Sequence, residues 1–413
     1  MRLLMIASGY LPYLFSENLC NAKLVLALKE AGIAVDVISK IDEGPIYDNQ
    51  WHAPWDQLRS NTYSIQYGGS RMDRFCDVIY SGLKMGHFSS GIRWVRRAYE
   101  QAQQLLNQNS YDAVLTRSPN DLTHLVGYKL KKDTGIKWIA NWNDPANAIW
   151  PEPYTHHYSS YQRNRALQYA RKIIQSADYI TFPSNTLRSH FISYFPELSS
   201  QKTEVIPHIG LVESVFKRTE RGISRDKFYL CHSGNLSKER DPELTFQALR
   251  DIINQGFSRF EFHIMGHIND YTQQLIQKYD LTDYVKCIGG YPYLTAIDKL
   301  QYYDVLVLLE AKLKKGIFFA SKFTDYAQTG LPILAISPTD GFANDMIKTY
   351  GGGILADNTN AKSIKDAIIQ LIDLWKKGTL STISSSKMYE QFAPNCVVNQ
   401  YIEIVNQYNT SQV

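Results

Sequence analysis

The segment SKFTDYAQTGLPILAI, residues 321–336, places a cation and a carboxylate at a spacing suited to a charged ligand. Ser321 is positioned to begin a helix as its N-cap, Lys322 falls in the first turn, and Asp325 follows one turn later on the same side. A lysine there opposes the helix dipole, whereas an anion in front of the helix start is held by free backbone N–H groups. We therefore expect a diphosphate at Lys322 and a ribose diol at Asp325. A surface ion pair between the two side chains is the alternative.

A second segment, FYLCHSGNLSKERDPELTFQALRDI at 228–252, reads as a strand, a glycine turn, a basic loop and a helix. The turn at Gly234 and Asn235 allows the backbone to approach a ligand closely, because glycine carries no Cβ. Lys238 or Arg240 would reach a phosphate from the side opposite Lys322. The spacing matches neither the GxxxxGK[ST] phosphate loop nor the GxGxxG dinucleotide turn.

Short apolar runs alternate with helical patterns along the whole chain, which is typical of an α/β protein with parallel sheets. The predicted strands are 3–8, 34–39, 112–117, 137–142, 179–184, 204–208, 228–234, 260–266, 285–290, 304–310, 332–336 and 352–356. Helical patterns include 18–31 and 242–253. The sequence therefore predicts two Rossmann-like, doubly wound parallel-sheet domains that face a cleft, with ligands at the carboxyl ends of the strands.

The strand and helix pattern restarts after a polar, charge-dense stretch, which we interpret as an interdomain linker. This interpretation gives a first domain at 1–208 and a second at 209–394. The stretch 41–75 is expected to be an irregular insertion that lines or covers the cleft.

Composition excludes several classes of protein. The 413 residues carry a formal net charge of +4, which is too mild to indicate a nucleic-acid partner. Five widely spaced cysteines predict neither a zinc site nor a disulfide framework, and they favour a reducing, cytoplasmic setting. No apolar run approaches the ~20 residues of a membrane span.

Taken in order, SGYLPY, AGIAVDVIS, SADYITFPSN, TEVIPH, HSGNLSKERDPELTFQAL, IMG and SKFTDYAQTGLPILAI resemble the GT-B fold glycosyltransferases. The resemblance spans nearly the whole chain and is closest to the large retaining family, often called family four, of bacterial envelope-polysaccharide enzymes. It implies transfer of a sugar from a nucleotide-diphosphate donor to a hydroxyl of a glycan or lipid-linked acceptor, with configuration retained. It requires no metal ion and no cofactor, the nucleotide sugar being the donor substrate.

The resemblance also implies roles for individual residues of the second domain. Gly234 and Arg240 match positions that bind the donor diphosphate, and Lys322 matches the lysine of relatives with an SKxxEY motif. Asp325 stands where the second glutamate of a spaced pair binds the ribose. Arg240 and Lys322 would be catalytic, because positive groups offset the charge that develops on the departing diphosphate.

Two further residues match positions near the nucleotide, and two positions depart from the family pattern. Gly266 matches a glycine close to the nucleotide, and Tyr291 is the candidate for the nucleobase. Ile317 stands where the first glutamate of the pair is expected, while Glu310 lies upstream in a different register. The usual glycine pair after the first strand is replaced by FSEN, residues 15–18.

The acceptor is expected on the first domain. Arg117, at the end of the predicted strand 112–117, would contact the donor or an anionic acceptor. Asp144, after the strand 137–142, is offered as an acceptor-positioning group or base. The alternatives are a surface strand end for Arg117 and an Asp-Pro turn for Asp144. The resemblance also implies that the terminal helix, 395–413, returns to the first domain.

A membrane-peripheral position on the inner leaflet would suit a lipid-linked acceptor. The basic and apolar segment 91–106 is the candidate membrane surface, and a helix packed on its own domain is the alternative. Two other functions remain open: a nucleotide-sugar-binding relative without turnover, indicated by Ile317, and a GT-B-fold epimerase acting on the nucleotide sugar itself.

Overall fold

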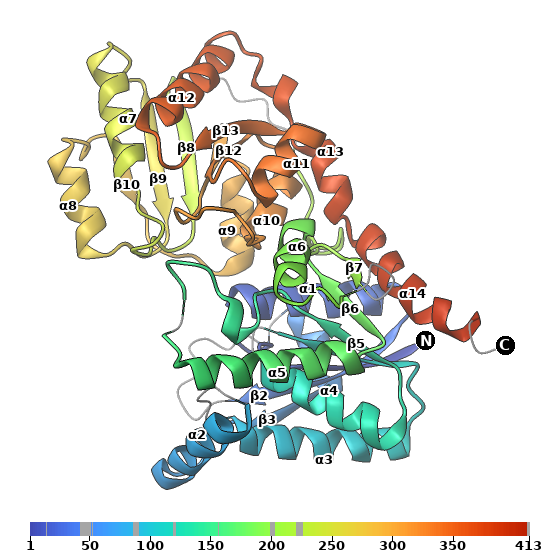
Figure 1. Ribbon diagram of the computed structural model, residues 1–413. Coiled ribbons are helices and arrows are strands. Elements are labelled where there is room, and N and C mark those ends of the chain that lie inside the picture. Colours follow the sequence, from blue (N-terminus) through green and yellow to red (C-terminus); the bar gives the residue numbers. More distant parts are fainter. Residues whose placement is uncertain are drawn as a thin grey trace. The chain divides into compact units, whose positions relative to one another are not determined.

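The computed structural model describes residues 1–13, 15–41, 51, 53–85, 91–118, 121–155, 157–198, 203–219 and 226–410. The chain forms two compact units (Figure 1). Unit 1 comprises Met1–Val212 with Pro394–Val413, and unit 2 comprises Glu213–Ala393. Among the described residues, no helix has the length and apolar character needed to cross a membrane.

Unit 1 is built on a seven-stranded sheet with the order β3-β2-β1-β4-β5-β6-β7, and each neighbouring pair is parallel. Its strands are β1 (Arg2–Ala7), β2 (Ala34–Ile41), β3 (Thr62–Gln66), β4 (Ala113–Arg117), β5 (Trp138–Asn141), β6 (Tyr179–Phe182) and β7 (Thr203–Val205). The central strands are apolar and buried along their length, as strands covered on both faces must be.

Helices cover both faces of this sheet: α1 lies above it and α3 below it in Figure 1. The helical segments are α1 (Ser16–Glu30), η1 (Trp55–Asn61), α2 (Arg71–Met85), α3 (Ile92–Gln108), α4 (Asp121–Thr134), η2 (Asn147–Ile149), α5 (Ser160–Ser176) and α6 (Asn185–Tyr194). The packing of α3 on β2 and α4 buries Trp94 and Val95, so the apolar residues of 91–106 belong to the core. The alternative interpretation of that segment is the correct one.

The last helix, α14 (Pro394–Thr410), belongs to unit 1 although it is far away in sequence, and it packs against α1. Its buried face consists of Val397, Val398, Tyr401, Ile404 and Val405. Two cations of unit 1 also hold it. Arg117 donates to the Tyr401 hydroxyl at 2.8 Å, and Lys137 donates to the backbone oxygens of Ile404, at 3.0 Å, and of Val405.

Unit 2 has a six-stranded parallel sheet with the order β10-β9-β8-β11-β12-β13. Its strands are β8 (Phe228–Ser233), β9 (Phe260–Met265), β10 (Val285–Cys287), β11 (Val305–Leu309), β12 (Ile333–Ser337) and β13 (Gly353–Asp357). The two parallel sheets with their helices confirm the α/β class and the two parallel-sheet domains predicted from the sequence.

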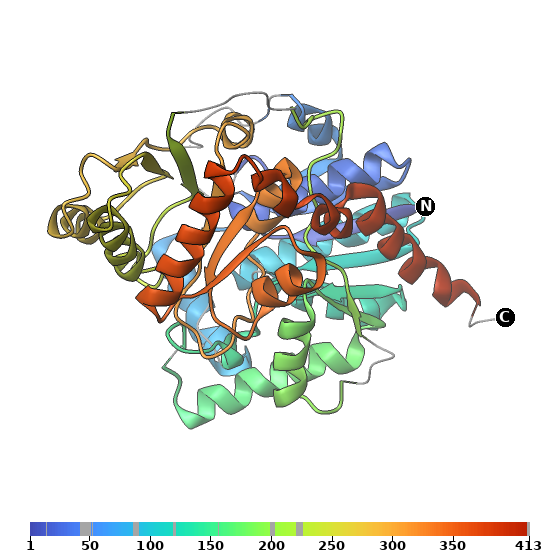
Figure 2. The ribbon, with the colours of Figure 1, turned by 90° about the horizontal axis from the view of Figure 1, so that it is seen from above.

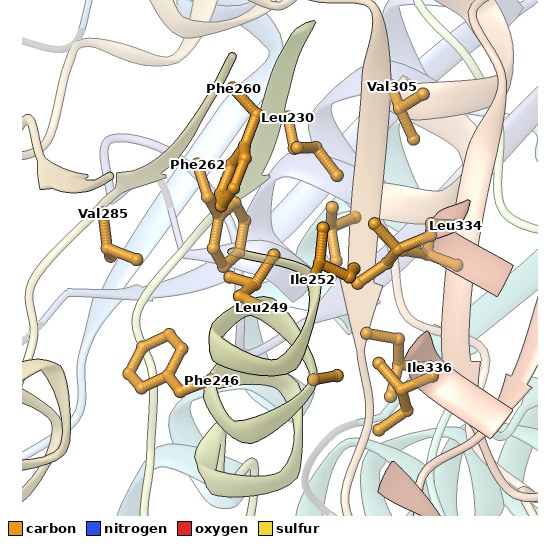
Figure 3. Close-up of a cluster of buried hydrophobic side chains, with 14 of the residues drawn as sticks. Leu230, Phe246, Leu249, Ile252, Phe260, Phe262, Val285, Val305, Leu334 and Ile336 are labelled. Carbon is orange, nitrogen blue, oxygen red and sulfur yellow. The ribbon is translucent and has the colours of Figure 1, made fainter. Parts of the chain in front are cut away.

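The helical segments of unit 2 are α7 (Glu243–Asn254), α8 (Asp270–Lys278), α9 (Tyr293–Leu300), α10 (Lys322–Thr329), α11 (Phe342–Tyr350), α12 (Ala361–Lys376), η4 (Leu380–Ile383), α13 (Ser386–Tyr389) and η5 (Glu390–Phe392). Phe246, Leu249 and Ile252 project from α7 into an apolar core against the sheet (Figure 3). Viewed from above, α12 lies alongside this sheet in Figure 2, and it packs on α7 and β13. The core fixes β8 and β9, whose carboxyl ends carry the candidate site.

The structure corrects the expectation for 41–75. Residues 42–50 and 52 lie outside the described residues, but the remainder contains η1, the edge strand β3 and the start of α2. The sequence of β3, TYSIQ, lacks the apolar run of a central strand because this strand lies at the sheet edge and is only partly buried. The predicted strand 204–208 is also shorter, and β7 ends at Val205.

Candidate functional site

The candidate site of unit 2 lies where its strand order reverses. Strands β8 and β11 are neighbours, while β9 and β10 extend the sheet on one side and β12 and β13 on the other. The loops after β8 and β11 therefore diverge at this point, which is where doubly wound sheets bind ligands. Gly234 follows β8, and Glu310 follows β11.

The turn after β8 needs its glycine. Gly234 has φ +123°, a conformation that side-chain-bearing residues rarely adopt, and its N–H donates to the Met265 backbone oxygen at 2.8 Å. Asn235 accepts a bond from the His267 N–H at 2.9 Å. A Cβ on Gly266 would lie 2.5 Å from the Gly234 oxygen, so glycine is required there as well. The turns after β8 and β9 thus form one rigid backbone surface.

Lys322, the first residue of α10, brings its amine to this surface. A Cβ on Gly234 would lie 2.5 Å from Lys322 Nζ, so the glycine leaves room for the amine. Lys322 Nζ also lies 3.4 Å from Nε2 of the buried His232. Nδ1 of His232 is 2.9 Å from the Val307 backbone oxygen, which can only accept, so Nδ1 carries the proton. The Nε2 lone pair therefore faces the lysine.

The charges around this amine are strongly coupled. Burial, together with the charge of Arg240, lowers the pKa of Lys322 to about 7, and Cys231, Asp325 and Glu310 oppose the change. Burial raises the pKa of Glu310 to about 7, against the effect of Arg240 and Lys322. The charge of Arg240 acts on both groups, so Arg240 lies within electrostatic range of Lys322 and Glu310. An anion that bound here would meet two cations.

Asp325 and its neighbours are held by two tyrosines that the sequence did not single out. The Tyr293 hydroxyl, on α9, donates to Asp325 Oδ1 at 2.8 Å, and Asp325 is buried. The Tyr326 hydroxyl accepts the Ser233 N–H at 2.8 Å and so ties α10 to the end of β8. These hydrogen bonds hold the Asp325 carboxylate in place and attach α10, which also carries Lys322, to the end of β8. Tyr291, proposed for the nucleobase, lies at the surface near α9 and is 37% exposed.

Ser321 does not cap α10 with its side chain, so this part of the sequence prediction is wrong. Its backbone is already helical, with φ −54° and ψ −33°, whereas a capping residue needs an extended conformation to turn its hydroxyl toward the helix. Instead, the Ser321 backbone oxygen accepts from the Thr324 N–H at 3.2 Å and from the Thr324 hydroxyl at 2.7 Å.

The predicted acceptor residues lie at the carboxyl edge of the unit 1 sheet. Arg117 ends β4 and is buried, so it is not the surface strand end of the alternative interpretation. Besides its bond to Tyr401, it donates to the side chain of Asn21, and Nη2 lies 4.0 Å from Glu17 Oε1. Arg117 therefore connects α1, β4 and α14.

The charges of Arg117 and Asp144 both act on the carboxyl group of Glu17. Glu17 lies in the first turn of α1, which follows β1, and Asp144 follows β5, with Asn143 donating to Glu17. Burial raises the pKa of Glu17 to about 7, where Arg117 opposes the change and Asp144 adds to it. Burial also raises the pKa of Asp144 to about 6. Sequence reasoning noted FSEN as a departure but did not recognise its glutamate as part of this site.

Comparison with known families matches both units. Residues 21–209 match the model described as Glycosyltransferase Family 4, and residues 215–387 match the model described as Glycosyl transferases group 1. Among solved structures, a sucrose-phosphate synthase from Thermosynechococcus elongatus superposes with a TM-score of 0.71 at 15% identity, covering 100% of both chains. The chain belongs to the GT-B glycosyltransferases.

Two other solved structures are similar to this glycosyltransferase. HepE from Anabaena, in complex with UDP and glucose, has a TM-score of 0.67 and 16% identity over 98% of this chain and 100% of its own. A UDP-N-acetylglucosamine 2-epimerase has a TM-score of 0.59 and 14% identity over 98% of this chain and 96% of its own. At these identities the likeness shows the fold alone. A comparison with curated protein sequences gives no match.

Ile317, where this glycosyltransferase departs from the family pattern, lies in an environment that disfavours a carboxylate. Ile317 is buried, and its neighbour Gly316 forms a parallel bridge with Gly341. A carboxylate in place of Ile317 would lose its hydration. Glu310, in contrast, acts electrostatically on Lys322. Within the described ranges, no cluster of three His, Cys, Asp or Glu side chains is arranged to hold a metal ion.

Proposed function

We propose that this glycosyltransferase moves a sugar from a nucleoside-diphosphate donor to a hydroxyl of a glycan or lipid-linked acceptor, with the anomeric configuration retained, in cell-surface polysaccharide biosynthesis. The observation that carries the proposal is that the Lys322 amine lies next to the Gly234 turn, where the charge of Arg240 also acts on it. A rigid turn and two cations at the switch point of a parallel sheet suit a diphosphate.

The donor we propose is a uridine diphosphate sugar. Structures of the similar HepE are described as complexes with UDP and with UDP-glucose, which supports this choice for the first donors to test. In unit 2, Asp325 would accept hydrogen bonds from the ribose diol while Tyr293 holds the carboxylate in place. The base would lie toward Tyr291, and Gly266 would line the backbone surface beneath the nucleotide.

The transfer breaks the bond between the anomeric carbon and the diphosphate oxygen, and the diphosphate leaves with the electron pair. Lys322 and Arg240 would offset the charge that develops on it. The acceptor hydroxyl forms the new bond at the anomeric carbon and loses its proton. We assign the acceptor to unit 1, where Asp144, whose pKa is raised by burial to about 6, could orient the hydroxyl or take this proton. The charge of Asp144 would also raise the pKa of the nearby Glu17. No metal ion enters this scheme.

The test is incubation of the full-length protein with a panel of UDP sugars. Proton NMR would follow release of UDP and the configuration of the sugar first formed, with and without EDTA. Release of UDP with retained configuration, unaffected by EDTA and abolished by Lys322→Ala, is the expected result. Binding without release would indicate a nucleotide-sugar-binding protein. Conversion of the donor to its epimer without release of UDP would indicate an epimerase, and either outcome overturns the proposal.

A further inference from the structure

Helix α2 exposes its apolar side and buries its polar side. Met72, Phe75, Ile79 and Leu83 recur at spacings of three and four residues and therefore share one face. Their exposed fractions are 70%, 60%, 43% and 61%. The opposite side contains Asp77 and Ser81, which are 6% and 0% exposed. A surface helix of a soluble domain normally has the reverse arrangement.

This orientation is fixed by specific contacts. Arg93 on α3 forms ion pairs with Asp73 at 2.7 Å and with Asp77 at 3.2 Å, which hold the acidic side of α2 inward. At the other end, Arg165 on α5 donates to the backbone oxygens of Leu83, at 2.9 Å, and Lys84, at 3.1 Å. Figure 1 shows α2 beside α3 at the margin of unit 1. The apolar face is therefore held outward by the fold.

The charges beside this face are positive. Both acidic residues of α2 are engaged by Arg93, while its cations Arg71, Arg74 and Lys84 are exposed. The neighbouring α5 has no Asp or Glu in its sequence, SYQRNRALQYARKIIQS, and its Arg163 is exposed. An exposed apolar stripe flanked by cations is complementary to the acyl boundary and the anionic headgroups of a lipid bilayer.

We propose that the face formed by Met72, Phe75, Ile79 and Leu83 inserts into the interface of an anionic membrane, with Arg71 and Lys84 at the headgroups. The 15-residue helix is about 22 Å long, so it lies in the plane of the interface and does not cross the bilayer. This assigns the membrane surface to α2 instead of to α3, whose apolar face is buried. The proposal goes beyond the donor chemistry and does not depend on it.

The experiment measures sedimentation of the full-length protein with vesicles of phosphatidylcholine alone and of phosphatidylcholine mixed with phosphatidylglycerol. The variants are Phe75→Ser with Leu83→Ser, which shortens the apolar face, and Arg71→Glu with Lys84→Glu, which reverses the flanking charge. Ile192→Ser is the matched control, since Ile192 is an exposed apolar residue on α6 of the same unit. Circular dichroism and hydrolysis of soluble donor report that each variant is folded.

The wild type and Ile192→Ser should bind the anionic vesicles and bind the neutral vesicles weakly. Phe75→Ser with Leu83→Ser should lower the partition coefficient by a factor on the order of a hundred, because two large apolar side chains are removed. Charge reversal should abolish the preference for phosphatidylglycerol. Two results would overturn the proposal: equal vesicle binding by the wild type and the apolar double variant, or no binding of the wild type to anionic vesicles. In the second case, a wild-type dimer that the same variant dissociates would identify the face as a contact between two copies of the chain.

Discussion

Lys322 Nζ lies 3.4 Å from His232 Nε2, and the two residues are ninety positions apart in the chain. Because Nδ1 of the histidine donates to the Val307 backbone oxygen, Nε2 is available to accept a hydrogen bond from the ammonium group. Burial keeps the pKa of His232 well below its ordinary value, so the ring is neutral. The lysine thus has a neutral acceptor behind it and the Gly234 turn in front, which directs its charge toward the end of β8.

Removal of either cation should weaken diphosphate binding selectively. Lys322→Ala and Arg240→Ala should each reduce the affinity for UDP by roughly 1.5–3 kcal/mol, because each removes a charge-assisted phosphate contact. Affinity for uridine should change little. Isothermal titration calorimetry measures both ligands. Lys312→Ala is the control, since Lys312 pairs with Asp241 at 3.1 Å on the surface of the same unit. Unchanged UDP affinity in both test variants would reject the donor-site assignment.

His232 should act as a positioning residue for Lys322. His232→Leu removes the acceptor and should weaken UDP binding, while His232→Gln retains an acceptor and should restore part of it. The pH at which UDP affinity declines should also move downward in His232→Leu, because the ammonium form loses its partner. Calorimetry over a range of pH measures both effects. A purely structural histidine would alter the melting temperature of both variants without moving this pH.

Donor binding should take up protons above neutral pH. In the free site the pKa of Lys322 is lowered to about 7 and that of Glu310 is raised to about 7. The charges of Arg240, Cys231 and Asp325 also act on the Lys322 amine, and the neutral His232 lies 3.4 Å from it. A bound diphosphate raises both pKa values, since it favours the ammonium and disfavours the carboxylate.

The affinity for UDP should therefore be highest below about pH 7 and should fall as the pH rises through that value. Calorimetry in buffers of different ionisation enthalpy measures the uptake directly. The phosphate of UDP titrates as well, so the comparison is with Lys322→Arg, whose guanidinium stays charged and should show a smaller decline. An identical profile for the two proteins would show that Lys322 is already charged in the empty site.

Asp325 and Tyr293 should discriminate ribose from deoxyribose. Asp325→Asn should weaken UDP binding more than binding of 2′-deoxy-UDP, because the carboxylate would lose its bonds to the diol. Tyr293→Phe removes the hydroxyl that donates to Asp325 Oδ1 and should give a smaller effect with the same preference. Competition binding with the two nucleotides measures the ratio. Equal losses for both ligands would mean that Asp325 has a structural role.

The sequence predicted most of the strands, and it placed the candidate donor site after β8 and β11, because both depend on local patterns. The apolar runs of β8 and β11, the glycine after β8 and the cation at the start of α10 can each be recognised within about ten residues. Since both strands end at one edge of a parallel sheet, their loops had to meet. The bond between Tyr293 and Asp325 could not be foreseen, because it depends on how α9 and α10 pack.

The sequence also could not predict the surroundings of two features, the carboxyl groups of Glu17 and Asp144 and the helix α2. Glu17 lies in the segment after β1 and Asp144 in the segment after β5, and only the strand order brings these together. Helix α2 is amphipathic in sequence, but periodicity alone does not say which face is buried. The ion pairs of Arg93 with Asp73 and Asp77 decide that in favour of the polar side.

The final prediction concerns the attachment of α14 to unit 1. Tyr401 is buried against this unit and its hydroxyl accepts from Arg117 at 2.8 Å. Tyr401→Phe keeps the ring but leaves a buried guanidinium without this acceptor, which should lower the free energy of unfolding by roughly 1–3 kcal/mol. Removal of residues 394–413 should destabilise the protein far more, because it also exposes the apolar surface of unit 1 that the helix covers. Urea unfolding measures both variants, and Tyr161→Phe, at a residue 62% exposed on α5, is the control that should be neutral. If the truncated protein unfolded at the same urea concentration as the wild type, α14 would not be part of the unit 1 core.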